Sequence, residues 1–118
     1  MRDTAPARVE LLQGTLDLLI LRTLILGPAH GHAIAKHIQR TSEDVLQVET
    51  GSLYPALHRL EAKGSIAASW ELSEKGKRAR FYRLMPRGRR QLVAEQSKWD
   101  TLSRAIALIL KEVDQEAR

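Results

Sequence analysis

The chain has 118 residues, 43% hydrophobic and 28% charged, which suits one globular domain and excludes a collagen-like or wholly disordered chain. It contains no cysteine, which excludes disulfides, thiolate metal sites and cysteine nucleophiles and fits a reducing cytoplasm. A total of 19 Lys and Arg against 14 Asp and Glu gives a net charge of +5, which suits a polyanionic partner. The longest apolar stretch, residues 16–26, is too short to span a membrane, and the first residues lack the apolar run of a signal peptide.

The first half of the chain is predicted to begin with a flexible polar arm over residues 1–10. A helix over residues 16–26 follows, and a second helix is predicted over residues 32–40. Residues 45–49 alternate weakly, as in a short strand. The first helix is apolar nearly all round, so we expect one side to face the core and another to face a second subunit. The residues assigned to that subunit contact are Leu18 and Leu21.

A third helix is predicted over residues 51–64, where Gly64 is a natural end signal. Leu53, Leu57 and Leu60 recur at helical spacing and predict one buried stripe. The opposite face has no large aliphatic side chain, so it can meet a polar surface. It carries Tyr54, Pro55, His58, Arg59 and Ala62.

Residues 66–72 and 79–85 have the pattern of two strands, and residues 73–78 have the glycine and charges of a turn, which predicts a β-hairpin. Its expected packing residues are Trp70, Phe81 and Leu84. Between residues 73 and 90 the only acidic residue is Glu74, against eight basic ones: Lys75, Lys77, Arg78, Arg80, Arg83, Arg87, Arg89 and Arg90. A solvated charged turn would explain these charges, but their position after a candidate recognition helix favours contact with phosphates.

From Pro86 onward the chain is predicted to form one long helix with a heptad seam. The seam is interrupted by Glu95 and is strongest from Trp99 onward. An isolated helix cannot hide such a seam, so we expect it to pack on a second copy of the chain. The predicted dimer residues of this helix are Trp99, Leu102, Ile106, Ile109 and Val113.

This order of elements predicts a mainly α fold of the α+β class: a winged helix-turn-helix with a two-stranded β wing and a long C-terminal dimerisation helix. The expected units are an arm (1–10), a DNA-binding domain (11–85) and a dimerisation helix (86–118). The third helix would enter the major groove of duplex DNA, while the wing adds affinity through the backbone. The assigned DNA-contacting residues are Ser52, Tyr54, His58 and Arg59 on the helix and Lys75, Lys77, Arg78 and Arg80 on the wing. Arg59 could pair with a guanine, with a phosphate or with Glu61.

Several stretches resemble the PadR family of transcription regulators. The most specific is the third-helix run GSLYPALHRLEAKG over residues 51–64, and weaker matches stand in the right order at residues 13–21, 27–31, 80–84 and 88–92. The resemblance implies a dimer built from the first and last helices on a roughly palindromic operator, with half-sites about one helical turn, ~10 bp, apart. It also implies repression relieved by a small-molecule inducer or another signal. The family usually has tyrosine where this chain has His32, which is expected to take over that tyrosine's phosphate contact.

The sequence favours DNA binding over several other functions. His30, His32 and His37 lie close in sequence but do not follow a zinc pattern, so roles in a turn and at the DNA are favoured. Trp99 is a candidate ligand-pocket residue, as in some relatives, although interface packing is the favoured role. No phosphate loop, catalytic triad or HExxH motif is present, so an enzyme, or any cofactor, is not expected. The alternative is a winged-helix module that binds a protein or RNA.

Overall fold

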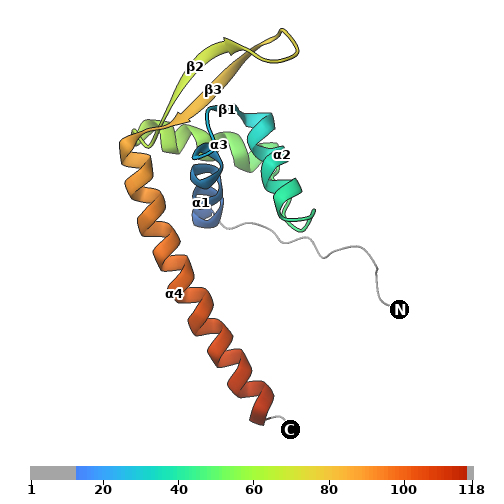
Figure 1. Cartoon of the computed structure of the whole chain (residues 1–118), viewed down its shortest axis with the longest axis vertical. Helices are drawn as coiled ribbons and strands as arrows, with labels where there is room; N and C mark the ends of the chain where they lie inside the picture. Colours follow the sequence, from blue (N-terminus) through green and yellow to red (C-terminus); the bar gives the residue numbers. More distant parts are fainter. Residues whose placement is uncertain (1–12, 117–118) are drawn as a thin grey trace, which may run out of the picture.

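The computed structural model describes residues 13–116, and within them the side chains of residues 14–112; the predicted arm lies outside this range. Its elements follow the predicted order and confirm a winged helix-turn-helix with a long C-terminal helix (Figure 1). The helices are α1 (Gln13–Leu24), α2 (Gly31–Thr41), α3 (Thr50–Ala62) and α4 (Pro86–Glu116). The strands are β1 (Ala29–His30), β2 (Ile66–Leu72) and β3 (Arg78–Leu84).

The sheet has three antiparallel strands in the order β1-β3-β2. Strands β2 and β3 form the predicted two-stranded wing, and β1 adds a short strand that was not predicted at the free edge of β3. The additional strand β1 pairs Ala29 with Tyr82 and His30 with Phe81. Two residues are too few to show alternation, which is why the sequence pattern gave no sign of this strand. The prediction of a strand over residues 45–49 was wrong: only Leu46 makes an isolated bridge. The segment follows a turn in which Glu43 and Asp44 have positive φ angles of 53° and 67°.

The core lies where α1, α2 and α3 pack together under the base of the hairpin. The predicted stripe of α3 is confirmed, since Leu53, Leu57 and Leu60 are all buried. The aromatic residue that β3 contributes to the core is Tyr82, which is 2% exposed. Phe81, the predicted core residue, lies one position away on the other sheet face and meets the His30 ring edge-on, with centroids 5.3 Å apart. Leu84 packs against the core as expected.

The first turns of α4 pack on the body, where Leu92 is buried in the core. The helix then leaves the body, and the molecule measures 58 × 37 × 22 Å along its principal axes (Figure 1). Along this free part, large apolar side chains are exposed to solvent: Trp99, Leu102, Ile106, Leu108, Ile109 and Leu110. No helix within the described residues is long and apolar enough to cross a membrane.

Candidate nucleic-acid interface

The exposed face of α3 carries three of the side chains predicted to contact DNA. The buried stripe on the opposite side fixes the rotation of the helix about its axis. Ser52, Tyr54 and His58 are therefore exposed, and Ser52 lies in the first turn, where the N–H groups of a helix lack internal partners. The side chain of the N-cap residue Glu49 makes no capping hydrogen bond to the first N–H groups of α3. This end of the helix is chemically suited to an anion such as a phosphate.

Tyr54 depends on a close approach between α3 and α2. A Cβ atom at Gly31 would lie 2.8 Å from the Tyr54 hydroxyl, so only glycine leaves room for this ring over the start of α2. His30 caps α2 by accepting a hydrogen bond from the Ala33 N–H at 3.2 Å, and its ring stacks near that of His32. His30 therefore has a structural role, while His32 remains exposed.

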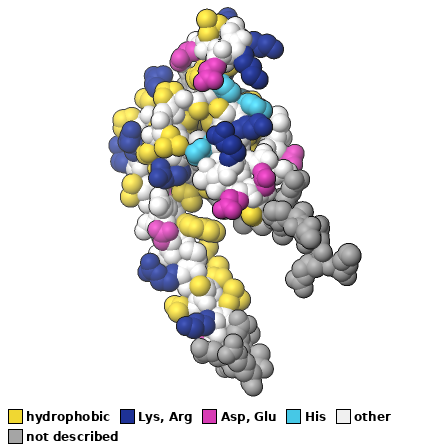
Figure 2. Space-filling model, turned by 45° about the vertical axis from the view of Figure 1, so that its right-hand side comes forward, with side chains coloured by type: hydrophobic (Ala, Val, Ile, Leu, Met, Phe, Trp, Pro, Cys, Tyr) yellow, Lys and Arg dark blue, Asp and Glu magenta, His cyan; other side chains and the backbone are white. Residues whose placement is uncertain are grey.

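An open hollow of about 710 Å³ lies between the start of α2, α3 and the wing. Six of the nine predicted DNA-contacting residues line it: His32, Tyr54, Lys75, Lys77, Arg78 and Arg80. Among the side chains that line it, Glu74 is the one acidic group. Figure 2 shows histidine and basic side chains gathered beneath the wing. The hollow therefore joins the recognition helix and the wing into one cationic surface.

The wing tip is a tight turn between β2 and β3. The Ser73 N–H donates to the Lys77 carbonyl at 2.8 Å, and the Gly76 N–H donates to the Ser73 carbonyl at 2.9 Å. This turn leaves Lys75, Lys77 and Arg78 exposed. Trp70, which was expected to pack, is 60% exposed instead, with the Arg78 guanidinium 5.4 Å from its ring centre.

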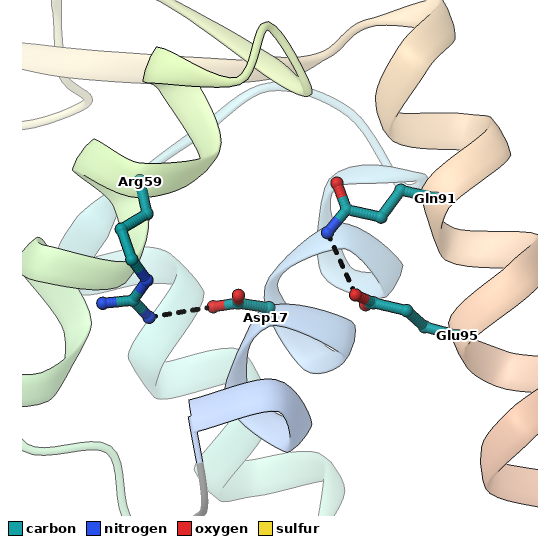
Figure 3. Close-up of polar contacts among 4 residues, drawn as sticks. All are labelled: Asp17, Arg59, Gln91 and Glu95. Carbon is teal, nitrogen blue, oxygen red and sulfur yellow. Dashed lines mark hydrogen bonds and ion pairs between the residues drawn. The ribbon is translucent and has the colours of Figure 1, made fainter.

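Two of the predicted arginines are occupied by ion pairs within the chain. Arg59 Nη2 lies 3.2 Å from Asp17 Oδ1 on α1 (Figure 3), and Arg80 Nη2 lies 2.6 Å from Glu61 Oε2 on α3. Glu61, one of the partners considered for Arg59 from the sequence, thus forms its ion pair with Arg80 instead. Both arginines stay more than a third exposed. In this structure the Arg59 pair connects α3 to α1, and the Arg80 pair connects the wing to α3.

The sequence did not predict a cluster of polar side chains around the buried Asp17. In Figure 3 Asp17 on α1 lies between Arg59 on α3 and Glu95 on α4. Gln91 Nε2 donates to Glu95 Oε1 at 3.0 Å, and Gln91 in turn accepts from the Ser65 hydroxyl at 2.5 Å. Arg59 Nε and Glu95 Oε2 are buried with no hydrogen-bond partner in the described part of the chain. Burial raises the pKa of Asp17 despite the opposing charge of Arg59, and the nearby Glu95 carboxylate raises it further.

The predicted dimer residues divide into two groups. Leu21 has no exposed surface, so its side chain belongs to the core and leaves nothing for a second subunit. Leu18 is half-buried at the edge of the core. The four α4 residues with described side chains, Trp99, Leu102, Ile106 and Ile109, are 46% to 60% exposed. The side chain of Val113 lies outside the described residues.

The histidines of α2 and of β1 before it do not form a metal site in the described part of the chain. Within residues 13–116 no group of three His, Asp or Glu side chains is arranged to hold a metal ion. His37 instead lies 3.4 Å from the Thr41 hydroxyl on the same helix.

Comparisons with known proteins agree with this architecture. The family model described as "Transcriptional regulator PadR-like family" matches residues 20–94. A transcriptional regulator of Mycobacterium tuberculosis is 30% identical over 97 residues, which cover 82% of this chain and 87% of that protein. A solved transcriptional regulator from Clostridium thermocellum covers 80% of this chain and 92% of its own at 29% identity, with a TM-score of 0.74. A PadR family transcriptional regulator from Eggerthella lenta covers 83% of each chain at 31% identity, with a TM-score of 0.70. All three are transcriptional regulators, the class of protein that the resemblance in the sequence implies.

Proposed function

Because this chain belongs to the PadR-like family of transcriptional regulators, we propose that it is a repressor that binds duplex DNA as a homodimer. The observation that carries the proposal is the cationic hollow between α3 and the wing. The major groove of B-DNA has the width of an α-helix, and its base edges distinguish all four base pairs. A duplex that accepts α3 in its major groove would place the adjacent backbone against the wing.

The contacts divide by chemistry. Tyr54 and His58 project from the exposed face of α3 and are assigned to base edges, and Ser52 at its N-terminal end is assigned to a phosphate. His32 and the wing cations Lys75, Lys77 and Arg78 are assigned to the backbone, where they add affinity that does not depend on sequence. Arg59 and Arg80 already form ion pairs within the chain, so each would have to share or break its ion pair in order to contact DNA.

The homodimer is supported by the uncovered seam of α4. Residues 105–110 are six consecutive apolar residues, so this stretch of helix is apolar on every side and favours more than one neighbour. A second α4 would cover the seam of Trp99, Leu102 and Ile106, and the half-buried Leu18 on α1 is available to the same partner. Two-fold symmetry then requires a roughly palindromic operator.

Release from the operator by a small-molecule inducer completes the proposal. It is supported by the family resemblance and by one aromatic side chain on the seam, Trp99, which is 47% exposed in the single chain. A flat apolar compound bound between the subunits would contact this indole and alter the angle between them.

The test is selection of short duplexes from a randomised pool, followed by competition binding across a salt series. We expect an inverted repeat that binds on the order of 10³-fold or more tightly than an unrelated duplex, with affinity falling steeply as salt rises. Equal binding to every duplex, or binding only to a hairpin RNA of equal length, would instead support the winged-helix interaction module.

A further inference from the structure

One face of the wing carries large apolar side chains that no described part of the chain covers. In the β2–β3 register Trp70 is opposite Arg80 and Leu72 is opposite Arg78, so these four residues share a face. Nearer the base, the same face buries Ile66 and Tyr82 in the core. The hairpin extends beyond the helices (Figure 1), which leaves Trp70 60% and Leu72 70% exposed.

The exposed indole is on the side of the wing that faces the recognition helix. Trp70 lines the same hollow as Tyr54 and His32, so a molecule bound along α3 would also meet the wing at this ring. The Arg78 guanidinium, 5.4 Å from the ring centre, stabilises one orientation of the indole through a cation–π contact. This contact favours one orientation of a ring that is otherwise largely exposed.

The surroundings of Trp70 indicate the kind of surface that covers it. The hollow contains cations and aromatic rings with one carboxylate, which is complementary to a polyanion with apolar edges. A DNA duplex offers this combination in its minor groove, where deoxyribose edges alternate with phosphates.

We propose that Trp70 is a specificity-determining residue whose indole packs into the minor groove beside the half-site and favours A·T base pairs there. The proposal rests on the proposed DNA-binding function. In the minor groove a G·C pair presents the N2 amino donor of guanine, which an indole face would leave without an acceptor, whereas an A·T pair presents no donor.

The chain has two tryptophans, which permits a direct test with the full-length protein. In Trp99→Phe all tryptophan fluorescence comes from Trp70, and in Trp70→Phe it all comes from Trp99. Each variant is titrated with two duplexes that share the selected half-sites but have A·T or G·C flanks. Anisotropy of a dye on the DNA reports binding, and quenching by acrylamide reports access to the indole. Light scattering verifies that both variants have the same oligomeric state as the parent chain.

We expect DNA to shield Trp70 from acrylamide severalfold and to leave the access of Trp99 unchanged. Trp70→Ala should weaken binding to the A·T-flanked duplex about tenfold, with a much smaller effect on the G·C-flanked one and the salt dependence unchanged. Bound DNA that leaves Trp70 as accessible as before, or an equal loss with both flanks, would overturn this inference while the DNA-binding function stands. Failure of every duplex to bind would overturn that function as well.

Discussion

Arg59 of the recognition helix α3 forms an ion pair with Asp17 of α1, 42 positions earlier in the chain, at 3.2 Å. Asp17 is 5% exposed, whereas the Arg59 side chain is 34% exposed. The carboxylate therefore bears more of the desolvation cost of the pair, which is why its pKa is raised although a cation is its nearest partner. The two partners should respond differently to substitution.

Arg59→Met should lower the free energy of unfolding at pH 7 by about 1–3 kcal/mol, because it leaves a buried carboxylate without its cation. Asp17→Asn should cost less or nothing, because the neutral amide removes the desolvation penalty and Arg59 remains partly in water. The double variant should recover most of the loss. Urea unfolding measures all three, and the more exposed pair provides the control: Glu61→Gln should stay within about 1 kcal/mol of the parent. A double variant no more stable than Arg59→Met would contradict the assignment.

The raised pKa of Asp17 predicts a dependence of stability on pH. A carboxyl whose pKa is higher in the folded than in the unfolded chain contributes stability below the ordinary value, 3.8, and this is lost as pH rises through the raised value. The charges facing it are Arg59 on α3, Lys63 immediately after α3 and Glu95 on α4. The unfolding free energy of the parent minus that of Asp17→Asn should therefore fall as pH rises above 3.8. A difference that is flat or rises with pH would contradict this prediction.

Gly31→Ala should weaken operator binding by about 1 kcal/mol, or roughly fivefold, because the new methyl group displaces the Tyr54 ring from the start of α2. The displaced group is the end of a side chain, so stability should change little. Gly14→Ala is the matched control, since nothing lies within 4 Å of a Cβ there. In a Tyr54→Ala background the Gly31 substitution should have no further effect on affinity; an undiminished effect would assign the loss to the backbone of α2.

Ile106→Glu should convert the proposed dimer into monomers, because it places a charge in the apolar seam of α4. Loss of two-site attachment should reduce operator affinity by about 100-fold or more. Light scattering and anisotropy measure the two effects. Lys111→Glu, at an exposed position of α4 off the seam, is the control for added negative charge and should remain dimeric. An intact Ile106→Glu dimer would place the interface elsewhere.

Arg78→Ala should weaken binding to all duplexes and reduce the magnitude of the salt slope by about one, the value for one phosphate contact. Arg104→Ala removes a cation of α4 far from the wing and should leave the slope unchanged. The neutral Trp70 should also leave it unchanged, so the two wing residues are separable by a salt series. An unaltered slope in Arg78→Ala would remove this side chain from the interface.

The helices and the hairpin were predictable because each has a regular period. The stripe of Leu53, Leu57 and Leu60 predicted which face of α3 is buried, and the heptads predicted one long C-terminal helix with an apolar seam. A period does not specify the register of a strand with respect to the core. This is why Phe81 was assigned to the core in place of its neighbour Tyr82, since one position reverses the face.

The contacts of Asp17 could not be predicted from the sequence for a different reason. The sequence shows one acid inside an apolar helix and one glutamate that interrupts a heptad. Only tertiary packing brings Arg59 and Glu95 to opposite sides of Asp17 (Figure 3). The strand β1 and the exposure of Trp70 likewise depend on where distant segments lie and on how far the hairpin extends.

The base of α4 has a mechanical consequence. A Cβ at Gly88 would overlap the Ser65 carbonyl oxygen, and the same carbonyl accepts from the Met85 N–H at 3.0 Å, so α4 starts at a closely constrained angle. With 31 residues the helix is about 46 Å long, so a tilt of about 5° at its base displaces its far end by roughly 4 Å. In the proposed dimer the same geometry links the two ends of α4. A small shift where the two α4 helices meet would move the two recognition helices by ångströms relative to each other. In the proposed dimer, the close packing at Gly88 would then help to set the spacing between the two recognition helices.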